Sequence, residues 1–579
     1  MTKDEVAAAL DEIGTLLELK GENPFRTRTY HNASRILGQF QGDFKKVVAD
    51  GKLEDIDGIG DALALKITTL VNTGKLKYLD DLRAETPAGM LDMLRLPGIG
   101  PKKVKALHDE LKIDSIDLLK KACDAGEVAK LKGFGAKTQA KILEGIAFLG
   151  KVGKRVRIDL ALPLGLRLLD QLKALPGVIR AELCGSLRRL RETAKDIDIL
   201  LSSADAAPIM EAFVKLPEVL QVTGHGPTKS SIVAELALGS EKVVLNADLR
   251  IVTDDLFPYA LQHFTGSKEH NVRLRQRAIE MGYSLSEYGL TGDKGNVPCE
   301  TEEDIYKALG LTYIPPELRE DTGEIAAAEK KQLPELIGFD ALRGVFHNHT
   351  TYSDGTATLE EMALAAKALG WEYFGVGDHS QSLTVAHGLS PERVRAQWAE
   401  IDQLNKKLKG IQILRGTECD ILADGSLDYD DELLAGFDYV VASVHSLFNL
   451  SEEDQTARVC KALAHPATTM LGHATGRLLL RRDGYKIDLE KVIQTAAQHG
   501  KMIEINAQPM RLDLDWTYVK RARELGVKIV INPDAHRPGE LALTVFGLHV
   551  ARRGWLTAAD VFNTLGLKAV LKELARMKG

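Results

Sequence analysis

The stretch CGSLRRLRETAKDIDILL, from Cys184 to Leu201, decides which fold the central part of the chain adopts. It contains a Gly-Ser turn, a cluster of basic residues and an apolar run that predicts a buried β-strand. Because side chains alternate between the two faces of a strand, Asp196 and Asp198 should share one face. Ile197 and Ile199 should point into the core. Two carboxylates on one face predict a site for divalent metal ions.

A third carboxylate follows in LNADLRIV, where Asn246, Asp248 and Arg250 alternate with apolar residues. Three acids on neighbouring strands could hold two Mg²⁺ ions, which activate an attacking hydroxyl and stabilise a pyrophosphate leaving group. The Gly-Ser turn and its arginines would bind the triphosphate, so this region favours nucleotidyl transfer. A lone Asp-x-Asp pair is common in turns and at strand ends, but acids inside an apolar strand require a compensating charge.

The spacing resembles the palm of family X DNA polymerases, in which a Gly-Ser turn, an Arg pair and Asp-x-Asp precede an Asp-x-Arg strand. The resemblance implies that Gly185, Ser186 and Arg189 contact the incoming triphosphate. It also implies that the site takes Mg²⁺ or Mn²⁺ and that one acid helps to deprotonate the primer 3′-hydroxyl. The implied catalytic and metal-binding residues are Asp196, Asp198 and Asp248, of which the last assists deprotonation.

The composition of the 579-residue chain is that of a soluble globular protein, with 44% hydrophobic and 27% charged residues. Its length suits about three or four domains. No apolar run approaches the length of a membrane span, and the opening MTKDEVAAAL lacks the pattern of a signal peptide. The five cysteines are scattered without a CxxC pair, which indicates reduced thiols and no zinc ribbon. A cytoplasmic location is expected.

The net charge of -7 argues against a wholly basic nucleic-acid binder, so contacts with DNA would use local patches or backbone amides. Three segments suit such contacts: IDGIGDALALKI, LPGIGPKKVKAL and LKGFGAKTQAKIL each place a Gly-x-Gly turn before a helix. They look like helix-hairpin-helix motifs, although a single copy could be a packing corner. Repetition favours binding of the phosphate backbone. The candidate DNA-binding residues are Gly58, Gly60, Gly98, Gly100, Gly133 and Gly135.

The first 85 residues, with GENPFRTRTYHNAS and TGKL, also resemble the small N-terminal domain of family X polymerases. In members with 5′-deoxyribose phosphate lyase activity, a Schiff-base lysine lies seven residues before the threonine of TGKL, which corresponds to Lys66. Ala62 stands near the position of a partner lysine in those members. An ordinary lysine on a DNA-facing helix is therefore the alternative for Lys66.

The segment HFTGSKEHNVRLRQRAIEMGYSLSEYGL, residues 263–290, resembles the part of the same family that lies beside the nucleotide sugar and the minor groove. A cis or tight Gly-Ser turn and a following helix are implied. The arginines of that helix could also form a solvated face. The implied contacts are Phe264, Gly266 and Ser267 with the sugar, Asn271 with the base edge and Arg275 with the template strand.

The last part of the chain places candidate metal ligands after successive β-like runs, with helical stretches between them. Reactive groups at the carboxyl ends of alternating strands are typical of a β/α barrel. A single histidine at a strand end is more often structural than a ligand, but nine such residues in the same relative position are not readily all structural. The candidate ligands are His347, His349, Asp354, His379, Glu418, His445, His473, Asp534 and His536.

This ligand pattern resembles the PHP phosphoesterase family, named for polymerase and histidinol phosphatase. The resemblance implies a distorted seven-stranded barrel, (β/α)7, with up to three Mn²⁺ or Zn²⁺ ions, and the N/O ligand set suits those metals. The ions would activate water against phosphorus and neutralise the phosphate oxygens. A complete ligand set predicts an active 3′→5′ exonuclease or related 3′-end phosphoesterase.

The combined resemblance is to bacterial or archaeal type family X DNA polymerases with a C-terminal PHP domain. It implies a multidomain, nucleoid-associated monomer that fills short gaps in DNA repair, using gapped or primer-template DNA and dNTPs, with no membrane partner. AP/dRP lyase or AP endonuclease activity is a further expectation. The alternatives are a phosphatase of small phosphomonoesters tethered to DNA and a non-catalytic DNA scaffold.

The expected domains are 1–85 (helical, with helix-hairpin-helix), 86–150 (fingers-like, helical, with helix-hairpin-helix), 151–255 (α+β nucleotidyltransferase-type palm), 256–316 (thumb), 317–342 (linker) and 343–579 (PHP).

Overall fold

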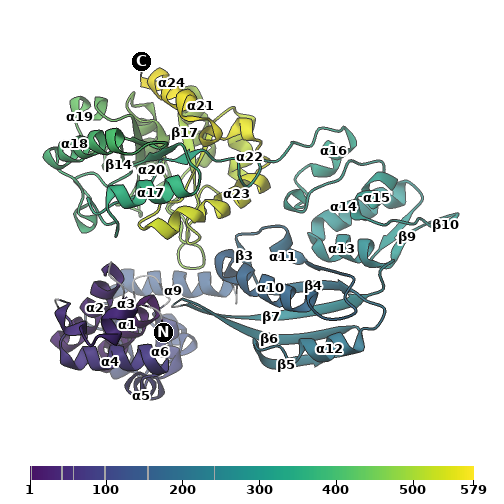
Figure 1. Ribbon diagram of the computed structural model, residues 1–579, viewed down its shortest axis with the longest axis horizontal. Helices are drawn as coiled ribbons and strands as arrows, with labels where there is room; N and C mark the ends of the chain where they lie inside the picture. Colours follow the sequence, from purple (N-terminus) through teal and green to yellow (C-terminus); the bar gives the residue numbers. More distant parts are fainter. Residues whose placement is uncertain are drawn as a thin grey trace. The chain divides into compact units, whose positions relative to one another are not determined.

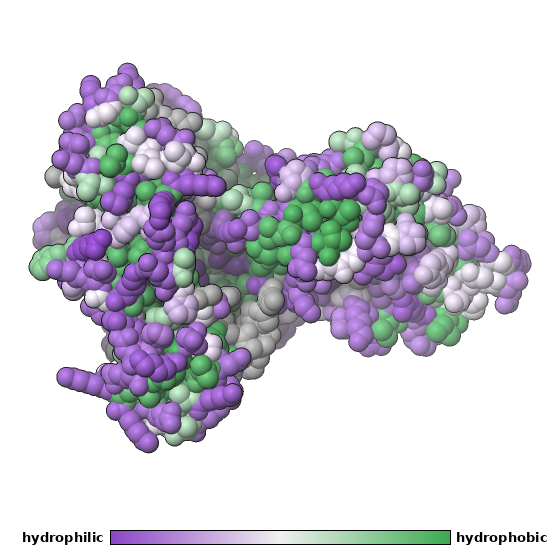
Figure 2. Space-filling view, turned by 90° about the horizontal axis from the view of Figure 1, so that it is seen from below, coloured by the Kyte–Doolittle hydropathy of each residue, from purple (hydrophilic) through white to green (hydrophobic). Residues whose placement is uncertain are grey.

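The computed structural model describes residues 1–578 except 2, 41–43, 57, 95, 97, 98, 153, 154 and 240. No helix in this described part is long and apolar enough to cross a membrane. Hydrophilic side chains cover most of the face shown in Figure 2, and its apolar residues lie in separate groups. The chain forms two compact units. The first comprises Met1–Lys154, Glu235–Val244 and Leu480–Arg482, and the second comprises Arg155–Ala234, Leu245–Leu479 and Asp483–Gly579.

The N-terminal part of the first unit is helical, and its buried apolar side chains form two cores. One core is built mainly by the helices up to α5, where α1 packs along α2, and the other by the helices from α6 onward. The α-helices described here are α1 (Lys3–Lys20), α2 (Pro24–Gln39), α3 (Phe44–Ala49), α4 (Asp61–Thr73), α5 (Lys77–Glu85), α6 (Ala88–Met93), α7 (Pro101–Leu111), α8 (Ile116–Asp124) and α9 (Gly135–Val152).

A helix begins at each Gly-x-Gly motif, as the sequence predicts. Gly60 is the N-cap of α4, Gly100 is the N-cap of α7, and α9 starts at Gly135. Pro101 occupies the first turn of α7, where the missing N–H of proline costs no hydrogen bond. Each motif therefore ends in a helix N-terminus with free backbone amides.

The palm of the second unit is a five-stranded sheet in the order β2-β4-β7-β6-β5 (Figure 1). β4 pairs with β7 in parallel, whereas β2 pairs with β4 and β5 with β6 in antiparallel fashion. The apolar alternation of β4 is confirmed, because Ile197 and Ile199 are buried. The palm elements are α10 (Ile158–Lys173), β2 (Arg180–Leu183), α11 (Gly185–Arg188), β4 (Asp196–Ser202), α12 (Ala207–Phe213), β5 (Val219–His225), β6 (Lys229–Leu238) and β7 (Glu241–Val252).

The thumb continues further along the chain than expected. Residues 317–342 were expected to form a linker, but Leu318 and Ala328 are buried in the same apolar core as Leu274 of the thumb. Apolar residues spaced between the charges give this segment a face to bury. The elements are α13 (Phe257–Thr265), α14 (Lys268–Glu280), β8 (Ser284–Ser286), β9 (Gly289–Gly292), β10 (Gly295–Asn296), α15 (Glu302–Ala308) and α16 (Glu324–Glu329).

The PHP part alternates parallel strands with helices, and the helices lie around the strands (Figure 1). Its strands form two parallel sheets, β11-β12-β13 and β14-β15-β16-β17-β18. Isolated bridges, Asn348 with Ala535 and His379 with Glu418, join the sheets into a distorted barrel. β13 and β14 are separated only by Arg415. The strands are β11 (Gly344–Val345), β12 (Tyr373–Gly375), β13 (Gln412–Leu414), β14 (Gly416–Asp420), β15 (Tyr439–Ser443), β16 (Met470–Leu471), β17 (Met502–Asn506) and β18 (Ile529–Asn532).

Counted with β13 and β14 as one bent strand, this barrel has the seven strands that the sequence implies. The core residues of the strands are almost completely buried, as parallel strands covered by helices require. The helices are α17 (Leu359–Ala368), α18 (Pro391–Lys407), α19 (Asp431–Ala435), α20 (Glu452–Ala464), α21 (Leu489–Gln498), α22 (Trp516–Glu524), α23 (Thr544–Arg553) and α24 (Leu567–Lys578).

Candidate active sites

The three predicted palm acids lie together on one face of the sheet. The parallel register of β4 and β7 pairs Asp196 with Asn246 and Asp198 with Asp248. Asp198 and Asp248 are therefore direct neighbours across the two strands, and Asp196 lies on the same face one pleat away. Asp196 is exposed and the other two are half-buried. The face can accept a cation from the solvent side.

The electrostatics of this face favour cations. Burial, together with the negative charges of Asp196 and Asp248, raises the pKa of Asp198 to about 6. Lys229 offsets part of this charge, since its Nζ lies 2.7 Å from Asp248 Oδ2. Lys229 is not among the residues that the sequence predicts for this site. It lies at the start of β6, and only the order of the strands in the sheet shows that β6 is next to β7. Clustered carboxylates that repel each other are suited to divalent ions.

The Gly-Ser turn lies directly against the acids. Gly185 has a φ of +57°, and a Cβ atom there would lie 2.3 Å from Asp198 Oδ2. The backbone N–H of Cys184 donates to the Asp198 carbonyl over 2.7 Å. Glycine is required at residue 185 for both reasons, because other residues rarely adopt this φ and a side chain would displace the carboxylate.

The arginines after the turn pair with acids of the thumb segment, and Arg189 is buried. Arg189 Nε donates to Glu320 Oε1 over 3.0 Å, and its guanidinium also donates to the Thr265 carbonyl. Arg188 forms an ion pair with Glu302 at 2.6 Å. The predicted triphosphate residue Arg189 is thus tied to the residue just before the thumb's Gly-Ser turn.

The peptide bond between Gly266 and Ser267 in the thumb turn is cis, one of the two forms that the resemblance implies. Phe264 lines a cavity of about 150 Å³ together with Asp198 and Asp248, so the structure brings it to the acids. Ser267 caps α14 by accepting from the backbone N–H of His270. The predicted Phe264 site is therefore adjacent to the palm acids.

Two predicted thumb contacts are engaged within the protein. The Asn271 amide is buried, accepts from Gln262 Nε2 over 2.8 Å and donates to the His263 carbonyl over 2.7 Å. Arg275 contacts His263 Nδ1 at 2.9 Å. These bonds fix both side chains near the start of α14.

The candidate residues of the first unit lie at helix starts and on α4. Gly58, Gly133 and Gly135 have positive φ values of 89°, 88° and 63°. Gly98 lies outside the described residues. The ammonium of Lys66 lies 5.5 Å from the centre of the Tyr78 ring and 6.0 Å from that of Tyr30. Aromatic faces thus surround this lysine on the protein side.

All nine predicted PHP ligands converge at the carboxyl ends of the barrel strands. Their donor atoms form three groups, each compact enough for one metal ion. His473 is in none of the groups, but its Nε2 lies 2.8 Å from Glu418 Oε1. The groups are His349, Asp354, His379 and His536; His347, His349 and Asp534; and His379, Glu418 and His445.

The donor atoms of this site fit metal ions. His347 Nε2 and His349 Nδ1 are buried and make no hydrogen bond to a described residue, although carboxylate oxygens lie 3.3 and 3.7 Å away. Burial, with His536 and His379 beside it, lowers the pKa of His349 to about 3. Despite burial, the carboxylate of Glu418 raises the pKa of His379 to about 10 and that of His445 to about 9, so the negative charges of the cluster also favour cations. A neutral imidazole is the form that binds a metal. Buried nitrogens beside carboxylates, without hydrogen bonds, are the arrangement expected of ligands.

Two acids behind the ligands were missed by the sequence analysis. Glu504 Oε1 contacts His347 Nδ1 at 2.7 Å, and Asp420 Oδ1 contacts His445 Nδ1 at 2.5 Å. Carboxylates in this position orient a ligating histidine and fix its tautomer. Both acids interrupt apolar strands, and Asp420 follows Glu418 by two residues, which are signals that the sequence contains.

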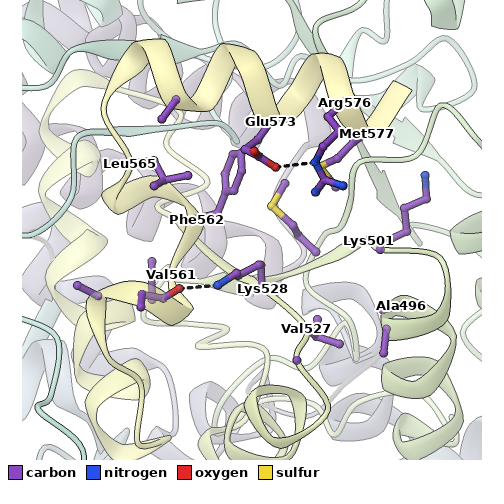
Figure 3. A pocket seen from close by; sticks show the side chains of 17 residues that line it. Ala496, Lys501, Val527, Lys528, Val561, Phe562, Leu565, Glu573, Arg576 and Met577 are labelled. Atoms are coloured by element: carbon purple, nitrogen blue, oxygen red, sulfur yellow. Dashed lines mark hydrogen bonds and ion pairs between the residues drawn. The ribbon is translucent and has the colours of Figure 1, made fainter. Parts of the chain in front are cut away.

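A cavity of about 490 Å³ lies at the opposite ends of the strands, near the starts of β17 and β18 (Figure 3). Val527, Phe562 and Leu565 contribute apolar surface, and Glu573 pairs with Arg576 at its rim over 2.8 Å. It contains none of the nine ligands. The candidate sites are therefore the smaller palm cavity and the ligand cluster.

Comparison with known proteins agrees with this geometry. Family models match residues 1–76 (helix-hairpin-helix domain), 90–147 (SAM-like helix-hairpin-helix tandem), 260–320 (DNA polymerase beta thumb) and 346–508 (PHP domain). A Bacillus subtilis protein named DNA polymerase/3'-5' exonuclease PolX is 38% identical over 580 residues, covering 100% of both chains. A probable phosphatase of a Thermoanaerobacter species is 30% identical over 246 residues, covering 40% of this chain and 96% of its own. The chain therefore belongs to the PolX family, the family X DNA polymerases with a C-terminal PHP domain.

Proposed function

We propose that the protein is a DNA-dependent DNA polymerase that fills short gaps during repair, and that its PHP domain acts on 3′ ends as a metal-dependent 3′→5′ exonuclease or phosphoesterase. The observation that carries the proposal is the pairing of Asp198 with Asp248 in the parallel register of β4 and β7. It supports a nucleotidyl-transfer site, because three carboxylates on one face can hold two divalent ions.

At the palm, Asp196, Asp198 and Asp248 would bind Mg²⁺ or Mn²⁺. The bound ions would supply Lewis acidity toward the primer hydroxyl and the triphosphate. Asp248 would accept the hydroxyl proton. The remaining contacts would be Gly185, Ser186 and Arg189 with the triphosphate, Phe264, Gly266 and Ser267 with the sugar, Asn271 with the base edge and Arg275 with the template strand.

At the PHP site, the nine ligands would hold up to three Mn²⁺ or Zn²⁺ ions, which would supply a nucleophile and neutralise charge on the phosphate. Glu504 and Asp420 would keep His347 and His445 in the ligating tautomer. Arg511, whose Nε lies 3.6 Å from Asp534 Oδ2, is positioned at the ligand cluster to offset anionic charge.

A second candidate for the PHP site is a phosphatase of small phosphomonoesters, with the rest of the chain binding DNA. The similarity of this part to a probable phosphatase favours it. Turnover of histidinol phosphate or an aryl phosphate without action on DNA ends would support this candidate. A non-catalytic scaffold is disfavoured by the complete ligand set.

A lyase activity of Lys66 on abasic DNA, or an AP endonuclease activity, is a further proposal. Lys66 lies beside the rings of Tyr30 and Tyr78 and donates to the Ala62 carbonyl over 3.2 Å. The proposal rests on its place seven residues before Thr73 of TGKL, where members with lyase activity carry a Schiff-base lysine. Borohydride trapping on abasic DNA should capture the wild type and not Lys66→Ala. Equal trapping of both, or of neither, would contradict the assignment.

DNA is the proposed partner, in gapped or primer-template form, with dNTPs as substrates. The helix-hairpin-helix glycines of the first unit would bind the phosphate backbone through helix amides. We further propose a monomer located in the cytoplasm and associated with the nucleoid.

The test uses a 5′-labelled primer in a one-nucleotide gap, incubated with Mg²⁺ or Mn²⁺, with and without dNTPs. Asp198→Ala should lose extension and keep shortening, and His349→Ala should do the reverse. Loss of both activities in Asp198→Ala would contradict separate sites. Absence of shortening by the wild type with either metal would refute the exonuclease assignment.

A further inference from the structure

Arg553, the last residue of α23 in the PHP domain, is fully buried, with 0% of its surface exposed. A buried guanidinium requires charged or hydrogen-bonding partners. Its Nη1 donates to the Arg189 carbonyl and to Glu320 Oε1, both over 3.1 Å. Its plane lies over the Trp516 ring, 4.7 Å from the centre. A cation of the PHP domain thus reaches the base of the palm's Gly-Ser turn.

Glu320 is shared between the two domains. Its Oε1 accepts from Arg189 Nε over 3.0 Å and from Arg553 over 3.1 Å, while Oε2 lies 3.5 Å from Arg191. The Glu320 side chain is only 7% exposed. Two arginines that bind one buried carboxylate oxygen fix each other's positions, because the carboxylate cannot move toward one without leaving the other.

Arg189 also contacts the thumb turn that is expected to lie beside the nucleotide. Its guanidinium donates to the Thr265 carbonyl, directly before the Gly266–Ser267 turn. A Cβ atom at Gly266 would lie 3.0 Å from the Arg189 guanidinium, so the turn and the arginine are in close contact. The direction of the Arg189 side chain is therefore set by Thr265 on one side and by Glu320 on the other.

We propose that Arg553 is a positioning residue for nucleotide insertion: it holds Glu320, which holds Arg189 in the direction of the incoming triphosphate. This inference rests on the proposed function of Arg189 in triphosphate binding. Arg553 itself touches no substrate. The PHP domain thereby contributes to the affinity of the polymerase site for dNTPs, in addition to its own chemistry on 3′ ends.

If Arg553 served only to hold α23 against the thumb segment, removing another contact between the same two parts should have the same effect on KM for dNTP. The neighbouring Arg552 also ties α23 to the thumb segment, through Glu317 at 2.7 Å and the Ile337 carbonyl at 2.7 Å. Its contacts within the described part of the chain include neither Glu320 nor Arg189. Arg552→Met is therefore a matched control from the same helix, since it removes a tie of the same kind without touching the Arg189 side.

The experiment measures KM for dNTP and kcat on one-nucleotide-gapped DNA with the full-length wild type, Arg553→Met, Arg552→Met and Arg189→Met. A charged hydrogen bond between Arg189 and the triphosphate is worth roughly tenfold in binding, so Arg553→Met, which releases Glu320 and with it Arg189, should raise KM for dNTP by up to about tenfold. Its kcat should stay within about twofold, because the acids are untouched. Arg189→Met should raise KM at least as much. Arg552→Met should leave KM unchanged, and all three variants should keep the wild-type rate of 3′ shortening.

A charge-conserving variant of Arg553 and a double variant with Glu320 are measured in the same assay. Arg553→Lys keeps the charge and should recover part of the affinity. Glu320→Gln should raise KM, and adding Arg553→Met to it should cause little further increase, since both act through the same contact. An unchanged KM in Arg553→Met beside a raised KM in Arg189→Met would overturn the inference and leave the proposed function intact. Equal increases in Arg553→Met and Arg552→Met, with lowered 3′ shortening, would overturn it in favour of domain docking. An unchanged KM in Arg189→Met would overturn both the inference and the proposed role of Arg189 in triphosphate binding.

Discussion

Gly185 lies so close to Asp198 that a larger residue would displace the carboxylate. A Cβ atom would come within 2.3 Å of Asp198 Oδ2, and the φ of +57° adds strain. We expect Gly185→Ala to lower kcat for nucleotide insertion about a hundredfold, because small displacements of reacting groups have effects of this size. Single-turnover extension checks this. Gly239→Ala is the control, since Gly239 has a φ of +59° with no atom within 4 Å of its Cβ position. Equal losses in both variants would mean that strain alone is responsible.

Glu302 illustrates how a buried charge stabilises the palm and thumb. Burial alone would raise the pKa of Glu302, but Arg319 and Arg188 outweigh burial and lower the pKa to about 2. Because the folded pKa lies below the unfolded value near 4.5, the stabilisation is complete above that pH and is lost as the pH falls toward 2. Its size at pH 7 is about 3 kcal/mol.

We therefore expect Glu302→Gln to lower the free energy of unfolding by about 3 kcal/mol at neutral pH and by much less near pH 3. Urea denaturation of wild type and variant at the two pH values measures the difference. Glu303→Gln, a change at the exposed neighbour, should have little effect at either pH. A difference between Glu302→Gln and wild type that does not change with pH would contradict the ion-pair origin.

At the scale of elements, the helix starts of the first unit follow local rules. Glycines with backbone angles that other residues rarely adopt precede two of these helices, Gly58 before α4 and Gly133 and Gly135 at the start of α9. The thumb extension differs. The segment 317–342 has the charge and proline content of a linker, and only its partners on the thumb reveal that residues such as Leu318 are buried.

We expect Gly135→Ala to weaken binding of gapped DNA without changing its sequence preference. Alanine at a φ of +63° would distort the start of α9 and turn its amides away from a phosphate. Fluorescence anisotropy over a range of salt concentrations measures the loss, expected to be about tenfold. Gly500→Ala is the matched control, because Gly500 has a φ of +62° and the Cβ positions of Gly135 and Gly500 both face open space. A comparable loss in Gly500→Ala would show that the effect is not local to the helix start.

At the scale of the whole molecule, the PHP barrel brings together ligands separated by up to 189 residues, from His347 to His536. Metal binding should stabilise the folded chain, because the unfolded chain has no such site. At a hundredfold excess over Kd the gain is about 2.7 kcal/mol, or a few degrees in Tm.

We expect Mn²⁺ to raise the Tm of metal-free wild type and to raise that of His347→Ala less. Calorimetry or thermal fluorescence measures the two shifts. His499→Ala is the control, because this exposed histidine of the PHP part lies outside the groups of candidate ligands and its loss should leave the Mn²⁺ shift unchanged. An equal Mn²⁺ shift in His347→Ala and wild type would show that the stabilising ion binds elsewhere.

The sequence by itself determined the local features of this protein. The alternation of β4 placed Asp196 and Asp198 on one face, and the strand-end histidines predicted which candidate ligands gather in the barrel, because periodicity and strand direction are encoded within short segments. The tertiary structure alone decided the long-range contacts. Glu504 behind His347 and Arg553 behind Glu320 join residues 157 and 233 positions apart, and only the folded backbone brings such carboxylates and cations to the same point. A buried charge is stable only beside a partner of opposite charge or a hydrogen-bonding group. Such partners come together only after the chain has packed.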